Sequence, residues 1–516
     1  MRQEINLVLS PKEATEEESI RNAALKALHT SNEELTAIKV VRKSIDARNR
    51  RIKMNVRIEA FINEKPLQHE FNPAFKNCSN GKRIIIVGSG PAGLFAALRL
   101  IELGYKPIIL ERGKKIKERK RDIALLNRES IVDEDSNYAF GEGGAGTFSD
   151  GKLYTRSTKR GSVRSILDLL IFHGADATIG IDAHPHIGTN KLPRIIQQIR
   201  ETILHYGGEF YFEQRVDDFI IKGKEIRGVK SQGISFEGEA VILATGHSAR
   251  NIYELLHQKD ILMETKAFAM GVRIEHPQEI IDSIQYHCTI RDSYLPAASY
   301  SLVRQVEGRG VYSFCMCPGG FIVPAATSPD EIVVNGMSPS MRNSKYANSG
   351  MVVQINIEDL HEYKEYGVMA GLKYQQHLEQ MTFRNGGQGQ VAPAQRMEDF
   401  VRGRVSNSLP DTSYHPGIIS SPLHMWLPEH IGPRLQEGFK AFDKKMRGYL
   451  TNEAIILGIE SRTSSPLRIP RDKENLQHPQ IHNLYPAGEG AGYAGGIISA
   501  AIDGQRIAEA IAKRAL

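Results

Sequence analysis

Cysteine and tryptophan are scarce in this sequence, and long hydrophobic runs are absent. The 516 residues include four cysteines and one tryptophan. Four thiols in so long a chain give no disulfide framework, which is typical of proteins from a reducing compartment. No stretch approaches the roughly 18 consecutive apolar residues of a membrane-spanning helix, and the N-terminus MRQEINLVLS lacks the layout of a signal peptide. We therefore expect a cytoplasmic protein with no membrane partner.

An excess of charge of one sign is also lacking. The chain has 66 Lys and Arg against 60 Asp and Glu, a net charge of +6, and 41% of its residues are hydrophobic. This balance is ordinary for a folded protein and too small to indicate nucleic acid as a partner. At roughly 150 residues per domain, the length predicts about three folding units.

The first 80 residues are expected to form a small α+β N-terminal domain. The sequence Ser10-Pro11-Lys12-Glu13 has the form of a capping box and predicts that a helix starts there. Apolar residues then alternate from Ile52 to Ile62, which predicts a half-buried strand. Eight Lys or Arg and one Asp lie between residues 39 and 57. That run is interpreted either as a solvated sheet edge or as a phosphate-binding ribbon.

A dinucleotide-binding pattern follows at residues 83–113, RIIIVGSGPAGLFAALRLIELGYKPIILERG. A strand, a glycine turn, a helix and a second strand ending in an acid can be read in order. Gly88 permits a tight turn, Gly90 lets the backbone approach a pyrophosphate, and Gly93 allows the helix to pack closely on the strand. Glu111, 23 residues after Gly88, is placed to bind the hydroxyls of an adenosine ribose.

Two distant segments favour FAD over a nicotinamide dinucleotide. GEAVILATGHS predicts a buried strand that returns beside the first one and ends in Ala244-Thr245-Gly246. NLYPAGEGAGYAGGIISAAIDG predicts a short strand, a turn carrying Glu489, and a last helix from about Gly496. FAD needs such a segment for its ribityl and flavin half, with the acid on a ribityl hydroxyl. The positive end of the last helix would then lie at the pyrimidine edge of the flavin.

Two further matches to the glycine pattern are not expected to bind a second dinucleotide. Residues 141–146 are followed by TFSDGKLYTR, which does not open an apolar helix, and residues 490–495 leave no room for a second strand. The sequence also lacks the Cys-x-x-Cys pair of disulfide reductases.

The glycine-rich stretch FGEGGAGTFSDGKL, residues 140–153, is expected to pass the flavin ring. Small residues let the backbone approach closely, and Ser149 and Lys152 are placed to reach flavin N5 or a substrate anion. The alternative is that Lys152 only covers the loop and contacts solvent.

Extended segments between residues 266 and 401 predict a mainly antiparallel substrate domain. Cys315-Met316-Cys317 places two thiols close together, which suits a redox pair, part of a metal site, or two buried hydrophobic residues. No metal site is expected. Arg462 and Arg468 lie just before the predicted flavin-binding C-terminus and are candidates for contact with an anionic substrate, or are ion-paired scaffold residues.

These motifs resemble a bacterial family of FAD-dependent proteins, the FAD-utilising dehydrogenases. The resemblance rests on GSGPAGLFAALRL with ERG, FGEGGAGTFSDGKLYTR, LATGHSARNIYELL, FAMGVRIEHPQ, YSFCMCPGG, NGMSPSMRNSKYANSGMVV and GEGAGYAGGIISAAIDG, and it extends from about residue 44 to the end. It implies a three-layer FAD-binding fold, an inserted substrate domain and an extra N-terminal domain. It assigns FAD contacts to Gly88, Gly90, Gly93, Glu111, Gly246, Gly488, Glu489 and Ile497, and no catalytic residue.

The predicted fold class is therefore α/β, with three domains. A Rossmann-like FAD-binding domain takes residues 81–265 and 402–516, the inserted substrate domain takes 266–401, and the N-terminal domain takes 1–80. Candidate catalytic residues are Lys152, Arg462 and Arg468. Candidate cofactor-binding residues are Gly88, Gly90, Pro91, Ala92, Gly93, Glu111, Arg112, Gly144, Gly146, Ser149, Val216, Thr245, Gly246, Gly488, Glu489, Gly496 and Ile497.

The predicted function is that of an FAD-dependent oxidoreductase. It would move a hydride or electrons between a small-molecule substrate and flavin N5, with an unknown electron partner. One alternative is a flavin-containing binding protein that contacts RNA through the basic N-terminal run. A lesser alternative is a flavin hydroxylase, but these proteins carry an Asp-Gly pair where this sequence has Ala-Thr-Gly.

Overall fold

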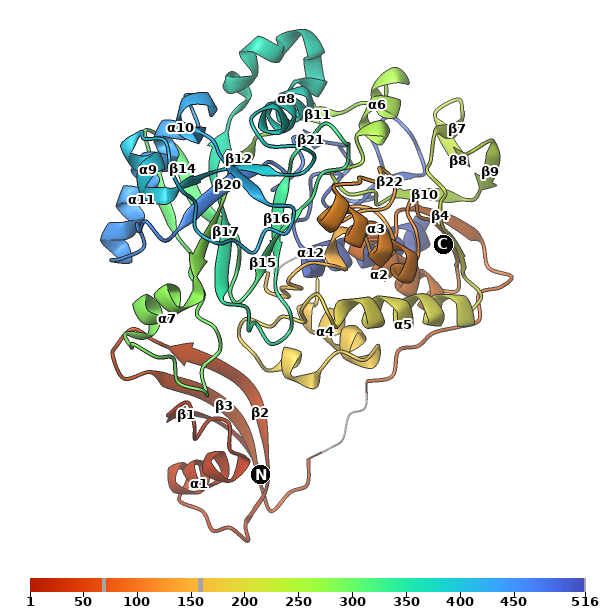
Figure 1. Cartoon of the computed structure of the whole chain (residues 1–516). Helices are drawn as coiled ribbons and strands as arrows, with labels where there is room; N and C mark the ends of the chain where they lie inside the picture. Colours follow the sequence, from red (N-terminus) through yellow and green to blue (C-terminus); the bar gives the residue numbers. More distant parts are fainter. Residues whose placement is uncertain (67–70, 156–160, 515–516) are drawn as a thin grey trace.

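The computed structural model describes residues 1–66, 71–155 and 161–514. It contains a large body, built around a parallel sheet and a longer antiparallel sheet, and a small N-terminal domain that projects from one end of it (Figure 1).

The N-terminal domain is a three-stranded antiparallel sheet with one helix on one face. Its elements are β1 (Arg2–Leu9), α1 (Glu17–Leu28), β2 (Leu35–Asp46) and β3 (Lys53–Ile62), in the order β1-β3-β2. The alternation seen in the sequence places Val56 and Ile58 of β3 against Ile20 and Ala24 of α1. The predicted strand and the small separate core are therefore confirmed.

The predicted start of the first helix is wrong by several residues. Glu13 accepts hydrogen bonds from the amide of Ser10 at 2.8 Å and from its hydroxyl at 2.7 Å, so the capping contacts form. They close a turn over residues 11–15, and α1 begins only at Glu17. A capping box stabilises a single turn, and the helix continues only where its apolar stripe meets the sheet.

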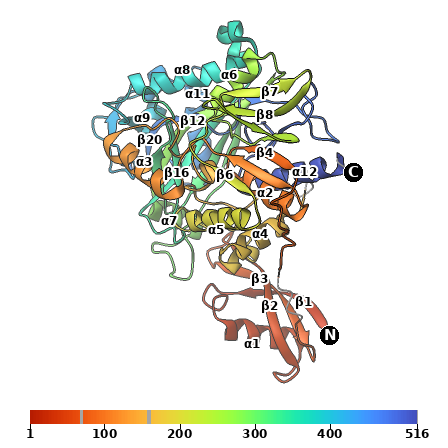
Figure 2. The ribbon, with the colours of Figure 1, turned by 90° about the vertical axis from the view of Figure 1, so that its right-hand side faces the viewer.

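The N-terminal domain contacts both halves of the large body (Figure 2). The backbone of Lys43 in β2 exchanges hydrogen bonds with Ile181 and Ala183, which follow the fourth helix. Ala47 and Ile52, at the β2–β3 connection, pack against the core of the antiparallel domain. The domain is thus docked by backbone pairing on one side and apolar packing on the other.

Residues 75–80 belong to the large body and not to the N-terminal domain, which corrects the expected boundary at residue 80. Phe75 packs edge-on against Phe172 and at a tilt against Tyr206, and Cys78 is buried in the same core. The Cys78 amide also donates to the Tyr206 carbonyl at 2.8 Å. The chain therefore enters the large body before the first glycine motif is reached.

The parallel sheet has the strand order β22-β10-β4-β5-β6. Its strands are β4 (Arg83–Val87), β5 (Lys106–Leu110), β6 (Glu209–Tyr211), β10 (Ala240–Leu243) and β22 (Leu484–Pro486). The segment that ends in Ala-Thr-Gly thus returns beside the first strand, and the C-terminal strand pairs with it, as predicted. This order brings the chain segments after β4, β10 and β22 to one edge of the sheet.

The parallel sheet is the middle of three layers because its side chains alternate between two faces. Ile84 and Ile86 pack against α2 (Pro91–Glu102), α5 (Leu192–His205) and α12 (Ile497–Arg514). Ile85 and Val87 face the small sheet of β7 (Asp218–Lys222), β8 (Glu225–Ser231) and β9 (Ile234–Glu237). The three-layer prediction is confirmed.

The second domain is built on a seven-stranded sheet in the order β13-β14-β17-β12-β20-β18-β19. Its strands are β12 (Phe268–Pro277), β13 (Val303–Val306), β14 (Arg309–Cys317), β17 (Tyr346–Ile355), β18 (Ala392–Arg396), β19 (Ile418–Ser420) and β20 (Ile455–Glu460). All pairs are antiparallel except β18 with β19. Since β19 and β20 belong to this sheet, the domain continues to about residue 460 and does not end at 401 as expected.

The remaining elements cover these sheets or connect them. They are α3 (Ile116–Glu129), η1 (Gly144–Gly146), α4 (Val163–Phe172), η2 (Ala177–Gly180), α6 (Arg250–Gln258), β11 (Glu264–Thr265), α7 (Gln278–Tyr286), β15 (Phe321–Pro324), β16 (Val334–Met337), η3 (Ile357–Met369), α8 (Ala370–Arg384), α9 (Met397–Arg402), α10 (Leu423–Trp426), α11 (Gly432–Lys445) and β21 (Leu467–Arg468).

Candidate FAD site

The first glycine turn has the steric requirements that the sequence predicts. Gly88 has a φ of +103°, and a Cβ there would lie 2.5 Å from the carbonyl oxygen of Ala244. A Cβ at Gly93 would lie 2.1 Å from the oxygen of Gly88. A Cβ at Gly90, by contrast, would have no atom within 4 Å. The first and third glycines are therefore required by the protein itself, and Gly90 faces open space.

The N-terminus of α2 is open toward the same space. Gly90 is its N-cap, no side chain caps it, and Pro91 is its first residue. The amides of the first turn, beginning with Ala92 because proline has no N–H, are free to bind an anion, and the helix dipole favours negative charge there. A pyrophosphate fits this end of the helix.

Glu111 ties three loops together at the end of β5. The carboxylate is buried and accepts from the amide and hydroxyl of Ser89 at 3.0 and 2.6 Å. Its other oxygen accepts from the amides of Gly113 and Gly141 at 2.9 and 3.0 Å. A ribose hydroxyl that binds Glu111 must share or replace one of these donors, and the Ser89 hydroxyl is the one that can rotate.

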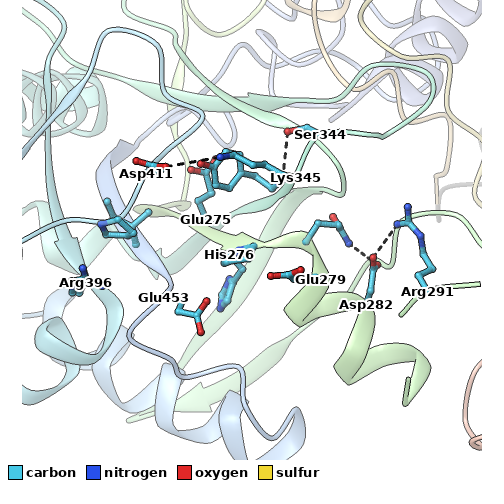
Figure 3. Close-up of a pocket in the computed structure, with 15 residues that line it drawn as sticks. Glu275, His276, Glu279, Asp282, Arg291, Ser344, Lys345, Arg396, Asp411 and Glu453 are labelled. Atoms are coloured by element: carbon cyan, nitrogen blue, oxygen red, sulfur yellow. Dashed lines mark hydrogen bonds and ion pairs between the residues drawn. The ribbon is translucent and has the colours of Figure 1, made fainter. Parts of the chain in front are cut away.

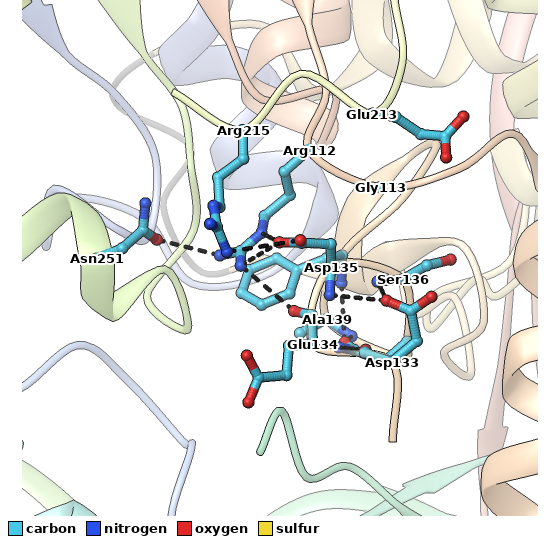
Figure 4. Close-up of polar contacts among 12 residues, drawn as sticks. Arg112, Gly113, Asp133, Glu134, Asp135, Ser136, Ala139, Glu213, Arg215 and Asn251 are labelled. Atoms are coloured by element: carbon cyan, nitrogen blue, oxygen red, sulfur yellow. Dashed lines mark hydrogen bonds and ion pairs between the residues drawn. The ribbon is translucent and has the colours of Figure 1, made fainter. Parts of the chain in front are cut away.

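Arg112 lies in a polar cluster beside this loop (Figure 4). Its guanidinium contacts Asp135 and Asn251 and lies 3.9 Å from the centre of the Phe140 ring. Asn251 also donates to the carbonyl of Val216 at 3.3 Å, while the Val216 amide has no acceptor among the described residues. The guanidinium of Arg112 therefore has its hydrogen-bond partners within the protein. The Val216 N–H, in contrast, is available to a ligand.

The second glycine loop joins the first turn to the last helix. A Cβ at Gly144 would lie 3.0 Å from the Cα of Gly90. A Cβ at Gly146 would lie 3.5 Å from the side chains of both Pro91 and Ile497. Ser149, in contrast, donates to the carbonyl of Gly146 at 2.8 Å and so closes its own turn. The loop forms the short helix η1 here, so it does not begin a second dinucleotide unit.

The C-terminal loop meets the Ala-Thr-Gly turn at the same edge of the sheet. Gly246 has a φ of +70°, with a weak 3.5 Å contact from the Thr245 hydroxyl to its carbonyl, and a Cβ at Gly490 would lie 2.5 Å from that oxygen. Gly488 donates to Asp503 at 2.8 Å. Gly496, with a φ of +101° and open space around it, directly precedes α12.

Glu489 is the acid that remains available. Its side chain is 30% exposed, and its one ion-pair contact among the described residues is the long 4.0 Å approach of His247 Nε2. Burial lowers the pKa of His247 to about 4, so this imidazole is neutral near pH 7. Burial also raises the pKa of Glu489 to about 7, against the opposing charge of Lys266. A Cβ at Gly495, beside the start of α12, would lie 3.8 Å from Glu489 Oε1, which fits the predicted ribityl contact.

Sequence reasoning missed the residues that hold this loop in place. Asp503 of α12 accepts from the guanidinium of Arg471, which also lies 3.9 Å from the centre of the Tyr493 ring. Tyr253 of α6 donates to the Gly490 carbonyl at 2.7 Å. A lone acid within the apolar segment IISAAIDG was the available signal for Asp503.

Arg462 is an ion-paired scaffold residue in this structure. Its guanidinium contacts Glu331 and Glu379 at 3.2 and 3.0 Å, and Arg250 contacts the same two acids at 2.6 Å. Burial and the neighbouring Glu379 raise the pKa of Glu331, whereas Arg250 and Arg462 outweigh burial and lower the pKa of Glu379. Both oxygens of each acid are occupied, so the guanidinium of Arg462 is not free to bind a substrate, which corrects the expected role.

Arg468 lies on β21, away from this cluster. Its guanidinium is 3.8 Å from Glu264 and 5.7 Å from the centre of the Tyr493 ring, and its side chain is 44% exposed. The contacts are weak, so Arg468 keeps its charge available at the edge of the C-terminal loop.

Lys152 extends from the second glycine loop toward the antiparallel domain. Its ammonium lies 3.6 Å from the sulfur of Cys317 and 3.5 Å from Asp150, and its side chain is 37% exposed. Asp150 is also paired with Arg342 at 2.8 Å. Lys152 therefore points across the boundary between the two domains, where the sequence analysis expected a substrate.

A separate cavity of about 530 Å³ opens in the antiparallel domain (Figure 3). It lies among the end of β12, α7 and the beginnings of β17 and β20, and none of the expected FAD positions lines it. Glu275 at its wall accepts from Thr412 and Ser413, and His276 donates from Nε2 to the carbonyl of Tyr449 at 2.8 Å. Glu275 and His276 are therefore already hydrogen-bonded within the protein.

Two absences concern the described residues only. Among residues 1–66, 71–155 and 161–514, no helix is long and apolar enough to span a membrane. Within the same ranges, no group of three or more His, Cys, Asp or Glu side chains is arranged to hold a metal ion.

Three of the eight basic residues of the N-terminal run make contacts within their own domain. Lys43 donates to the carbonyl of Ala14 at 2.7 Å, Arg48 pairs with Asp46, and Arg57 pairs with Glu4. These contacts favour the solvated-edge interpretation of the run over the phosphate-binding one.

Comparison with known proteins agrees with this geometry. Residues 267–463 match the model of the FAD-dependent protein C-terminal domain-like family, and residues 1–61 match a domain of unknown function, DUF8436. An uncharacterized protein of Clostridium beijerinckii is 40% identical over 509 residues, covering 95% of each chain.

Solved structures with lower similarity include CtdE in complex with FAD, at 13% identity over 83% of this chain and 84% of that one, with a TM-score of 0.34. L-proline dehydrogenase from P. horikoshii is 12% identical over 84% and 94%, with a TM-score of 0.36. The cofactor is FAD, and the chain belongs to the family of FAD-dependent proteins that join a Rossmann-like FAD-binding domain to this C-terminal domain and an extra N-terminal domain.

Proposed function

We propose that the protein is an FAD-dependent oxidoreductase that moves a hydride or two electrons between a small-molecule substrate and flavin N5. The observation that carries the proposal is the convergence of three distant segments at one sheet edge. Gly90 lies beside Gly144, Gly146 lies beside Ile497, and the available acid Glu489 lies beside the start of α12. FAD supplies the redox chemistry when bound.

Each segment has a distinct task in this proposal. The open N-terminus of α2 holds the pyrophosphate, and the Val216 amide and Glu111 hold the adenosine half. Glu489 accepts from the ribityl chain, and the N-terminus of α12 favours negative charge at the flavin edge. The glycines of residues 144–146 allow the chain to lie close to the cofactor.

Lys152 is the proposed substrate contact. It leaves the glycine loop, its contacts with Asp150 and Cys317 are long, and the charge of Asp150 is already matched by Arg342. One positive charge therefore remains to attract an anionic group of a substrate.

The experiment is an anaerobic screen of metabolite pools for bleaching of the oxidised flavin. Active pools are repeated with Lys152→Met and with Lys120→Met, a matched control at an exposed lysine of α3. A rise in KM confined to Lys152→Met supports the proposed contact. Equal kinetics in all three proteins contradict it, and absence of FAD from the purified protein contradicts the function.

A further inference from the structure

Two cysteine sulfurs lie at the boundary between the glycine loop and the antiparallel domain. Cys317 is buried and donates to the carbonyl of Cys315 at 3.2 Å. Two cations contact its sulfur, with Lys152 Nζ at 3.6 Å and Arg273 Nη2 at 3.7 Å.

Cys315 lies two residues before Cys317 on the same strand, β14. Its side chain is exposed, yet burial raises its pKa to about 11, against the charge of Lys152. The two thiols therefore differ: Cys317 is held between cations, and Cys315 is reachable by a small molecule.

The backbone of β14 is irregular at this pair. Phe314 of β14 lies opposite Gly350 of β17, and Cys317 lies opposite Asn348. The chain therefore advances by three residues on β14 and by only two on β17, which is a β-bulge. Cys315 has a φ of +44°, in the left-handed region. On a regular strand, alternate residues are about 6.6 Å apart, farther than the roughly 4 Å between Cβ atoms of a disulfide. A bulge bends the strand, so the spacing of a regular strand does not apply to this pair. Strained backbone of this kind is concentrated at functional sites.

Arg273 is fixed by a surrounding set of buried contacts. It pairs with Glu460 at 2.9 Å, donates to Asn348 at 2.9 Å and donates to the carbonyl of Cys315 at 2.9 Å. A Cβ at Gly336 would lie 2.0 Å from its guanidinium, so only glycine leaves room for this arginine. The Asn348 amide nitrogen has no partner among the described residues. The cation beside Cys317 is therefore built into the fold.

We propose that Cys315 and Cys317 form a reversible dithiol–disulfide pair that exchanges two electrons with the bound flavin, which rests on the proposed FAD-dependent function. As the S–S bond forms, the two thiols release two electrons and two protons, and these convert the oxidised flavin to its two-electron reduced form. In the opposite direction, the reduced flavin returns them and the S–S bond breaks, so no further reactant is needed. Cys315 is the thiol that a small thiol or disulfide substrate reaches.

The proposal is tested by anaerobic dithionite titration of the air-oxidised holoprotein. We expect wild type to consume four electrons per bound FAD, two for the flavin and two for the disulfide. Cys315→Ser and Cys317→Ser are expected to consume two, and Cys288→Ser, the control, four. Alkylation of the denatured oxidised protein is expected to label two of the four cysteines.

Consumption of two electrons by wild type, with all four cysteines alkylated, overturns the pair while leaving the FAD-dependent function intact. The flavin spectrum and FAD content of every variant are measured separately, so loss of cofactor is distinguished from loss of the disulfide. Cys315→Ala provides a second variant if serine disturbs the bulge.

Discussion

The position that a Cβ would take at Gly144 is 3.0 Å from the Cα of Gly90, so two glycine loops far apart in sequence touch without side chains between them. At Gly90 itself a Cβ has no atom within 4 Å, and the backbone φ of −70° suits any residue. The fold has room for a side chain at Gly90, whereas a pyrophosphate bound as we propose would not.

Gly90→Val is therefore expected to fold and to purify with less than about a tenth of the wild-type FAD, since each tenfold loss of affinity corresponds to about 1.4 kcal/mol. Gly90→Ala should retain an intermediate amount. FAD released on denaturation and the melting temperature of the apoprotein are the measurements. A fully flavinated Gly90→Val protein contradicts the placement of the pyrophosphate.

Removal of the N-terminal domain before residue 73 is expected to leave a protein that binds FAD, because the described FAD positions all lie after Lys82. The deletion removes the two backbone hydrogen bonds of Lys43, each worth about 0.5–1.5 kcal/mol. We expect a stability loss of about 1–3 kcal/mol, measured by denaturant unfolding. A second truncation at residue 81 also removes Phe75 and Cys78 from the core and should be less stable. Complete loss of FAD from the first truncation would show that the N-terminal domain completes the site.

Glu489→Gln is expected to weaken FAD binding about tenfold or more, because a hydrogen bond to a charged group contributes about 1.5–3 kcal/mol. It also has a pH signature in the apoprotein. The pKa of Glu489 in the folded protein, about 7, is above the usual 4.5, so folding favours the protonated acid. Its contribution to the free energy of unfolding is therefore fully present below pH 4.5 and is lost as the pH rises through 7.

The melting temperature of apo Glu489→Gln should therefore rise relative to wild type between pH 5 and 8. Glu129→Gln, at an exposed position at the end of α3, serves as the control. A difference that stays constant with pH contradicts the buried environment of Glu489.

Arg462→Met is expected to destabilise the protein by about 3–5 kcal/mol, because it leaves Glu331 and Glu379 with one guanidinium between them. Lys152→Met should leave the melting temperature nearly unchanged, since the Lys152 contacts are long. The melting temperatures of the Arg462→Met and Lys152→Met proteins, measured by thermal unfolding, distinguish a scaffold residue from a substrate contact. A stable Arg462→Met protein with an altered KM would restore Arg462 as a substrate contact.

Reduction of the flavin by NADH or NADPH is expected to be slow compared with the roughly 1–1,000 per second of typical turnover. The described chain has one five-stranded parallel sheet, and residues 141–146 end in the short helix η1. Anaerobic stopped-flow mixing with each nucleotide measures the rate. Saturable bleaching at typical turnover rates contradicts this prediction.

The cofactor half of the fold could be predicted from the sequence because its requirements are local. Gly88 is fixed by the positive φ of its turn, and Gly93 by its contact with Gly88 in the same strand–turn–helix unit. The apolar strand before Gly246 can enter only a buried sheet. The spacing of the glycines and of the acid at the end of the second strand therefore carries most of the information about the FAD-binding domain.

The domain boundary and the role of Arg462 depend on distant contacts. The segment IILGIE of β20 is fully buried, as a strand of either sheet would be, and only its pairing with β12 and β18 assigns it. Likewise, Arg462 meets Glu379 and Glu331 from separate parts of the chain. The sequence around Arg462 indicated a polar site, but Glu331 and Glu379, the partners of this arginine, lie far from it in the chain.

The four-charge cluster of Arg250, Glu331, Glu379 and Arg462 also affects how a substrate can enter. Arg250 comes from the parallel-sheet domain, and the other three come from the antiparallel domain. Swinging the two domains apart would withdraw Arg250 and leave two acids with one cation, at a cost of several kcal/mol. Catalytic turnover by hinge opening at this cluster is thus disfavoured, because each opening would separate Arg250 from Glu331 and Glu379.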